Sequence, residues 1–98
     1  MLEILRTHEF AEWLRSLRDL TGRAKIQARI DRLGIGNPGD VAPVGKGVSE
    51  LRMDYGPGYR VYYTLRERTV ILLLCSGDKG SQARDIAKAK RLAKEYQE

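Results

Sequence analysis

Two arginines on either side of a turn are the residues of this chain best suited to bind a phosphate group. Arg52 precedes and Arg60 follows Gly56–Gly58, whose Gly-Pro-Gly sequence is typical of a β-hairpin connection. A register with Leu51 opposite Val61 keeps the apolar side chains of both strands on one face. The same register places Arg52 directly opposite Arg60, and like charges in such positions repel each other.

This repulsion between the two arginines has two interpretations. Glu50 and Asp54, which share a strand face with Arg52, could neutralise both guanidinium groups. Alternatively, the pair is kept for an anion, because a guanidinium fork donates two parallel hydrogen bonds to a phosphate. The sequence leaves both interpretations open.

Three further cations stand where they could approach a polyanion. Lys79 follows the apolar run that ends near Ser76, and Arg84 comes five residues later. Lys46 lies between two glycines, which allow the backbone to approach a phosphate closely. The spacing of a nucleotide-binding P-loop, Gly-x-x-x-x-Gly-Lys-Ser/Thr, is absent.

The simplest chemistry for such a set of cations is the cleavage of RNA. The ribose 2′-hydroxyl is an internal nucleophile, so the protein need only align it and stabilise the charge of the transition state. A proton acceptor and a proton donor are still needed for a high rate. Such a set of cations could therefore cleave RNA without a metal, and Lys46 and Arg84 are candidate RNA-binding residues.

Other reaction classes lack the residues that they need. His8 is the only histidine and Cys75 the only cysteine, so no metal ligand set is available, and we expect neither a metal nor a cofactor. Cys75 lies in the most apolar segment and is expected to be a buried thiol without nucleophilic activity. A serine hydrolase would lack its base.

Length and charge set the outer limits. A chain of 98 residues is expected to form a single domain, 1–98, with one modest core. Its formal net charge of +5 favours an anionic partner. The longest apolar run, Val70–Cys75, is too short to cross a bilayer, and the N-terminal residues lack the charged and apolar regions of a signal peptide. We expect a cytoplasmic protein that does not bind membranes.

The first half of the chain predicts a strand and two helices. A short strand over 2–6 leads to Thr7, a suitable N-cap for a helix over 8–18. Gly22 is expected to interrupt the chain before a second helix whose Ile26, Ile30 and Leu33 face the core. The short connection favours an antiparallel helical hairpin. The Gly- and Pro-rich segment 34–47 is expected to be a loop.

The second half predicts three strands and a last helix. The strands cover about 48–54, 59–65 and 70–76, and the third is apolar on both faces, so it should lie centrally in the sheet. Ser81 can cap a helix that extends to about Tyr96. The order β-α-α-β-β-β-α describes an α+β domain, a helical hairpin packed on an antiparallel-rich twisted sheet with a C-terminal helix.

With these elements in place, the chain resembles the RelE/ParE superfamily of type II toxins, and most closely its HigB-like branch of addiction module killer proteins. The resemblance spans nearly the whole chain. It depends on the front helical hairpin and on three motifs, which are Glu50-Leu51-Arg52, Gly58-Tyr59-Arg60-Val61-Tyr62-Tyr63, and Leu72-Leu73-Leu74-Cys75-Ser76-Gly77-Asp78-Lys79 with Gln82, Asp85 and Ile86 after it.

The resemblance implies a partner and a target. Such toxins are paired with a small antitoxin, often one with a helix-turn-helix DNA-binding domain, so that operator DNA is contacted only through the antitoxin. RelE-like members cut messenger RNA in the ribosomal A site, whereas ParE-like members poison DNA gyrase. In RelE-like members, basic residues on the central strands and after the last strand form the active face, which implies catalytic roles for Arg52, Arg60 and Lys79.

One departure from the family pattern bears on the mechanism. Ribonuclease members often carry a proton-transferring Tyr or His near the last helix, but here neither occurs between Tyr63 and Tyr96. Asp85 could exchange a proton, but beside Lys79, Arg84 and the helix N-terminus a structural role is expected. Three hypotheses therefore stand: a ribosome-dependent mRNA endonuclease, a gyrase-inhibiting toxin of the same fold, and a non-enzymatic basic RNA-binding domain.

Overall fold

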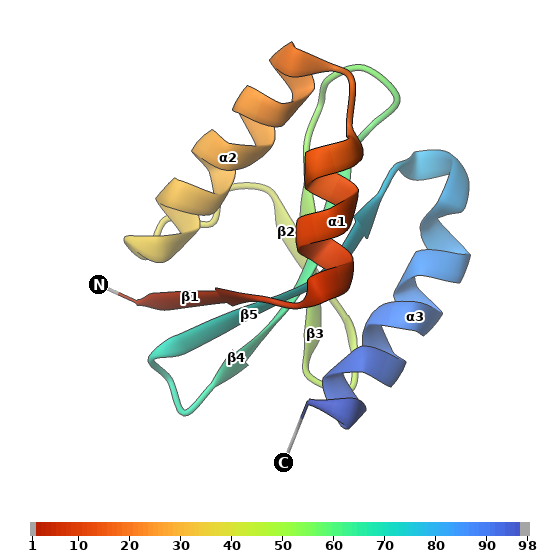
Figure 1. The fold of residues 1–98 in the computed structure, drawn as a ribbon. Helices are drawn as coiled ribbons and strands as arrows, with labels where there is room; N and C mark the ends of the chain where they lie inside the picture. Colours follow the sequence, from red (N-terminus) through yellow and green to blue (C-terminus); the bar gives the residue numbers. More distant parts are fainter. Residues whose placement is uncertain (1, 97–98) are drawn as a thin grey trace.

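The computed structural model describes residues 2–96, which form three helices packed on a five-stranded sheet (Figure 1). The strand order across the sheet is β1-β5-β4-β3-β2. The elements along the chain are β1 (Glu3–Arg6), α1 (His8–Ser16), α2 (Leu20–Gly34), β2 (Val41–Gly45), β3 (Val48–Arg52), β4 (Arg60–Arg66), β5 (Val70–Gly77), a 3₁₀ turn (Lys79–Ser81) and α3 (Gln82–Glu95).

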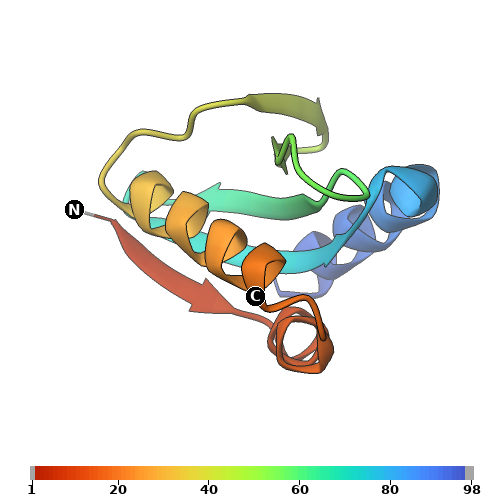
Figure 2. The same ribbon diagram turned by 90° about the horizontal axis from the view of Figure 1, so that it is seen from above.

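The sheet is antiparallel except at one edge, where β1 pairs in parallel with β5. Figure 2 shows β1 and β2 at opposite edges of the sheet. β5 lies between β1 and β4, and every residue from Ile71 to Gly77 is buried. This confirms the expectation that the most apolar segment forms a central strand, covered on both faces.

Helices cover both faces of the sheet and so create two cores. Phe10 and Leu14 of α1 and Ile26, Ile30 and Leu33 of α2 pack on one face, against side chains that include Leu51, Val61 and Leu73. Ala89 and Leu92 of α3 pack on the other face with Val48, Tyr62 and Leu74. The α+β class and the helical hairpin are as expected, and the two hairpin helices diverge from their connection as a V (Figure 1). Within residues 2–96, no helix combines the length and apolar character that a bilayer span requires.

The start of α2 differs from the expectation that Gly22 interrupts the chain. Asp19 caps the helix by accepting a hydrogen bond from the Gly22 backbone N–H at 2.9 Å, so Gly22 lies inside the first turn and is buried. A Cβ at this position would lie 2.7 Å from both Asp19 Oδ2 and the Tyr59 ring. The glycine is therefore explained by close packing and not by chain reversal.

The segment 34–47 also differs, because it contributes a fifth strand. β2 pairs with β3 in an antiparallel register that shifts at a bulge between Pro43 and Gly45. Proline lacks a backbone N–H and is tolerated at the edge of a sheet, which is where β2 lies. The β2–β3 turn has positive φ at Gly45, Lys46 and Gly47, as a tight turn between strands requires.

The hairpin of β3 and β4 has the expected register. Leu51 pairs with Val61, and Arg52 pairs with Arg60. Both strands are shorter than expected at this end, so residues 53–59 form a loop closed by a hydrogen bond from Met53 N to Tyr59 O at 3.0 Å. The paired arginines thus stand at the last rung of the ladder, beside an open loop.

Candidate functional site

A shallow hollow of about 510 Å³ at this end of the sheet brings together the three cations predicted to be catalytic. Arg52 and Arg60 come from paired strands, and Lys79 comes from the turn after β5. The backbone N–H of Lys79 donates to Pro57 O at 3.3 Å, which ties this turn to the loop between β3 and β4. Asp40, Asp54 and Tyr55 also line the hollow.

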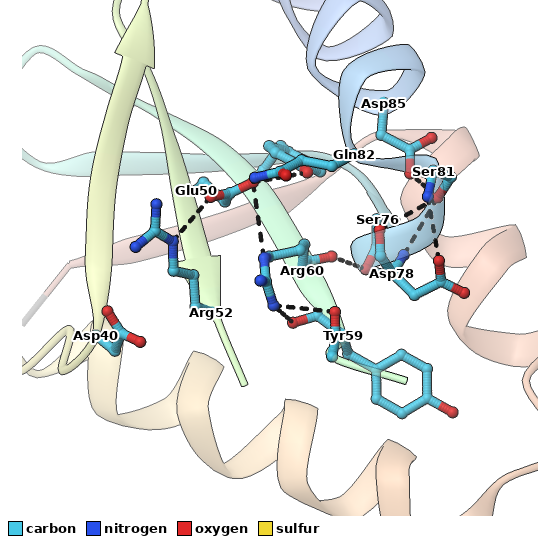
Figure 3. Close-up of polar contacts among 12 residues, drawn as sticks. Asp40, Glu50, Arg52, Tyr59, Arg60, Ser76, Asp78, Ser81, Gln82 and Asp85 are labelled. Atoms are coloured by element: carbon cyan, nitrogen blue, oxygen red, sulfur yellow. Dashed lines mark hydrogen bonds and ion pairs between the residues drawn. The ribbon is translucent and has the colours of Figure 1, made fainter. Parts of the chain in front are cut away.

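Glu50 has no exposed surface, and both arginines point toward its carboxylate (Figure 3). Its Oε1 accepts a hydrogen bond from Arg52 Nε at 2.9 Å, and its Oε2 lies 3.8 Å from Arg60 Nε. Oε2 also accepts from the Tyr62 hydroxyl at 2.9 Å and from Gln82 Nε2 at 2.7 Å. Glu50 therefore partly neutralises the arginine pair, and one carboxylate facing two guanidinium groups leaves a net positive charge.

The electrostatics of Glu50 favour a permanent anion. Burial raises the pKa of its carboxyl, but the hydrogen bonds from Arg52, Gln82 and Tyr62 outweigh burial and leave the pKa below its usual value. Burial and the hydrogen bond to Glu50 raise the pKa of Tyr62, so this hydroxyl stays protonated as a donor. With both oxygens engaged and no exposed surface, Glu50 positions its neighbours and is poorly placed to accept a proton from a substrate.

The two arginines are held differently. The Arg52 side chain is 41% exposed, and its Nη atoms make no hydrogen bond to any residue in 2–96. The Arg60 side chain is 13% exposed, and its Nη1 donates to Gly58 O at 3.0 Å and Tyr59 O at 3.3 Å. Arg52 thus presents the end of its guanidinium group to solvent, whereas Arg60 also braces the loop beside the hollow.

Arg29 of α2 supports this site from below, and its role was not predicted. Its Nη1 donates to Arg52 O at 2.6 Å, and its Nη2 donates to Pro38 O at 3.0 Å and Asp40 O at 3.1 Å. Burial and the charge of Arg32 lower the pKa of Arg29. The three carbonyl contacts hold the segment before β2 against the end of β3, which places the Asp40 side chain at the rim of the hollow near Arg52 (Figure 3).

The loop that borders the hollow is anchored to the start of α2. The hydroxyls of Tyr59 and Tyr55 donate to the Asp19 carboxylate at 2.9 and 3.3 Å, and the two rings stack with centroids 6.3 Å apart. The hydrogen bonds from the Gly22 N–H and Tyr59 lower the pKa of Asp19, while burial and the bond to Asp19 raise the pKa of Tyr59 to about 12. These contacts hold Tyr55 in place where it lines the hollow.

Polar side chains form hydrogen bonds within the turn between β5 and α3. Asp78 Oδ1 accepts from the N–H groups of Gly80 at 2.8 Å and Ser81 at 3.2 Å. The Ser81 hydroxyl donates to Asp85, which is 8% exposed. These contacts support the expectation that Asp85 is structural. They also explain Gly77, where a Cβ would lie 1.9 Å from Asp85 Oδ2.

The other predicted residues lie away from the hollow. Lys46 borders a groove between the β2–β3 turn and α3. Arg84 borders a cleft that also contains Trp13 of α1. Cys75 is buried, and burial raises the pKa of its thiol to about 12, in agreement with an inert core residue.

Comparisons with known proteins agree on family and fold. Residues 12–97 match the family described as Phage derived protein Gp49-like (DUF891), and the chain belongs to this family. An uncharacterized protein of Haemophilus influenzae is 48% identical over 94 residues, which cover 96% of this chain and 95% of that protein.

Three solved structures of the Escherichia coli toxin RelE share the fold at 12–13% sequence identity. An arginine-to-alanine double mutant in the free state has a TM-score of 0.71, covering 91% of this chain and 93% of that one. The isolated toxin has a TM-score of 0.68, covering 90% and 98%. RelE in the intact RelBE toxin–antitoxin complex has a TM-score of 0.66, covering 80% and 96%. These findings confirm the predicted RelE-like fold.

Proposed function

We propose that this member of the Gp49-like family, which has the fold of RelE, is the toxin of a toxin–antitoxin pair. The proposal is supported by the family, by the fold shared with RelE and by the basic hollow. One structural neighbour is described in complex with its antitoxin, and a comparable partner would cover cations of this chain. We propose a small acidic partner segment for that role, joined to a helix-turn-helix domain that binds operator DNA.

For the activity we propose cleavage of messenger RNA on the ribosome. The observation that carries this proposal is the grouping of Arg52, Arg60 and Lys79 around one hollow above a buried carboxylate. Arg52 offers free guanidinium donors to a phosphate, and Lys79 adds a further charge from the turn after β5. Both would stabilise the extra negative charge that develops when the 2′-hydroxyl attacks the phosphorus.

Proton transfer is the weaker part of the proposed site. Among the residues that line the hollow, Asp40, Asp54 and Tyr55 carry groups that can exchange a proton, and none of them is buried. A site with good charge stabilisation and modest proton transfer depends on a substrate that is already aligned. A message held in the ribosomal A site would provide that alignment, so we propose that cleavage requires the ribosome.

The test is controlled induction in Escherichia coli of the wild-type chain, Arg52→Ala, Lys79→Ala and, as a matched control, Arg18→Ala. Arg18 is exposed and lies outside the hollow. Wild type and Arg18→Ala are expected to arrest growth and to cut translated messages at codon-phased positions in primer extension. Loss of one transition-state cation should slow cleavage roughly 10²–10³-fold.

The alternatives give different results in the same experiment. Growth arrest with intact transcripts and gyrase-linked DNA breaks would identify a gyrase inhibitor. Normal growth with soluble wild-type protein would leave a basic RNA-binding domain. Efficient cutting of naked RNA by purified protein would contradict the ribosome requirement.

A further inference from the structure

A second basic surface lies at the far end of β4 from the hollow. Arg60 begins this strand and Arg66 ends it, so at about 3.3 Å per residue the two sites are roughly 20 Å apart. The surface is a groove of about 880 Å³ between the β2–β3 turn, the end of β4 and α3. We call it the α3 groove, and its cations are Lys46, Arg66, Lys90, Arg91 and Lys94.

The α3 groove is more strongly basic than the hollow. Its described lining contains five cations and no carboxylate, whereas Asp40 and Asp54 line the hollow. The nearest compensation is an exposed ion pair from Arg91 Nε to Glu95 Oε2 at 3.9 Å, which is weak in solvent. Within residues 2–96, the groove therefore concentrates charge without neutralising it.

One donor in the groove lacks an acceptor. Arg66 Nη2 is buried and has no hydrogen-bond partner among residues 2–96. A buried donor without a partner costs free energy, and the cost is relieved when the side chain shifts so that the donor meets water or an anionic oxygen. Arg66 therefore supports an anion in the groove only together with the charge of the lining.

The fold holds two lysines on opposite walls of the groove. A Cβ on Gly45 would lie 3.2 Å from Lys90 Nζ, so the ammonium group of α3 lies directly over the β2–β3 turn. Lys46, in that turn, has a φ of 55° and projects from a left-handed backbone conformation. Cations from two different elements are suited to a ligand that carries repeated negative charges.

The rest of the lining indicates which polyanion fits. No aromatic ring lines the described groove, so the stacking that holds single-stranded bases is not available. Its one large apolar side chain is Leu65, which is 52% exposed, and the other apolar residues are alanines. An amphipathic peptide helix needs deeper apolar anchor pockets than these. A phosphate backbone needs neither stacking nor apolar anchors, as in the recognition of RNA duplexes by shape and backbone.

We propose that the α3 groove binds the phosphate backbone of double-stranded RNA. The choice of RNA over DNA rests on the proposed action of the neighbouring hollow on RNA, whereas duplex binding itself requires no cleavage. Such a second site would hold a structured RNA while the hollow, roughly 20 Å away, engages a flexible strand.

The test is the binding of a fluorescein-labelled 20-base-pair RNA duplex to the purified chain, followed by anisotropy over a series of KCl concentrations. Charge reversal of two groove residues, Lys90→Glu with Lys94→Glu, is compared with charge reversal outside the groove, Arg18→Glu with Lys25→Glu. The groove variant should bind roughly tenfold more weakly, and its salt slope should fall by about 0.7–0.9 for each phosphate that it no longer neutralises. The control variant should lose much less affinity for the duplex.

A second groove variant separates binding from folding. Lys46→Asn places in a left-handed position a residue that tolerates it, so thermal stability should be equal or higher while affinity falls. These outcomes hold whether or not the chain is toxic.

Several results would overturn the proposal. They are an equal loss of affinity in the groove and control variants, tighter binding of a single strand or of a DNA duplex with the same sequence, and unchanged affinity in Lys46→Asn. Displacement of the duplex by polyglutamate at lower concentration than by unlabelled duplex would instead indicate a peptide groove.

Discussion

Replacing Glu50 by glutamine tests whether this buried carboxylate organises the candidate site. The substitution keeps the shape but removes the charge that Arg52 Nε contacts at 2.9 Å and Arg60 Nε approaches at 3.8 Å. The amide has only one oxygen, so either Arg52 Nε or the donors of Tyr62 and Gln82 must face an N–H₂ group and lose their acceptor. The change therefore leaves Arg60, which is mostly buried, without its counter-ion.

The cost can be estimated from these contacts. Breaking a buried ion pair by removing one partner typically costs about 3–5 kcal/mol, and the exposed side of Arg52 reduces this, so we expect a loss of about 2–4 kcal/mol. In a domain of this size, that loss lowers the melting temperature by roughly 10–25 °C. The measurement is thermal and urea unfolding by circular dichroism at pH 7.

The matched control is Asp54→Asn, the other acid that the sequence offered as a neutraliser. Asp54 is exposed and makes no ion pair within residues 2–96, so its replacement should change stability by less than about 0.5 kcal/mol. Glu50 is not the organising group if the free energy of unfolding of Glu50→Gln lies within about 0.5 kcal/mol of the wild-type value. The same conclusion follows if Asp54→Asn loses more stability than Glu50→Gln.

The dependence on pH gives a second readout of the same carboxylate. The pKa of Glu50 in the folded chain lies below its ordinary value of 4.5. Its stabilising contribution is therefore complete above pH 4.5 and is lost as the pH falls toward the lower folded pKa. The difference in unfolding free energy between wild type and Glu50→Gln should narrow over that interval, and a constant difference would contradict this assignment.

Three further predictions concern the fold around the site. Gly77→Ala should destabilise the chain by about 1–3 kcal/mol in urea unfolding, because its Cβ meets Asp85, and the additional change Asp85→Ala should restore part of the loss. The β4–β5 turn has positive φ at Glu67 and Arg68, so Glu67→Asn with Arg68→Gly should raise stability by about 1–2 kcal/mol, and a lower melting temperature would contradict this. Cys75, with a pKa of about 12, should resist iodoacetamide in the native state and react after unfolding, and rapid native labelling would show that the thiol is accessible.

Much of the fold follows from local patterns in the sequence. Thr7 caps α1 as expected, since its Oγ1 accepts from Phe10 N at 3.0 Å. The pairing of Leu51 with Val61 follows from alternation of apolar residues and from the turn between the strands. The central place of β5 follows from a segment that is apolar on both faces. In each case the deciding interaction involves neighbours along the chain or one repeated periodicity.

The strand β2 and the start of α2 show where local patterns fail. The Gly- and Pro-rich composition around Pro43 is typical of a loop, yet pairing with β3 supplies backbone hydrogen bonds that outweigh this preference. Gly22 resembles a helix breaker, yet packing against Tyr59 requires a residue without a side chain there. Tertiary contacts overrode a weak local preference at both positions.

The sequence by itself determined the candidate cations, because Arg52 and Arg60 are brought together by the register of one hairpin, and the glycines and proline of its turn indicate that register. Only the tertiary structure decided how those cations are held. Gln82 reaches Glu50 across 32 positions of the chain, and Arg29 reaches Arg52 across 23. Such contacts depend on how α2 and α3 pack on the sheet, and no periodicity or turn signal encodes the packing of one particular side chain against a distant one. The site is therefore a local arrangement of charges whose geometry is set by distant parts of the fold.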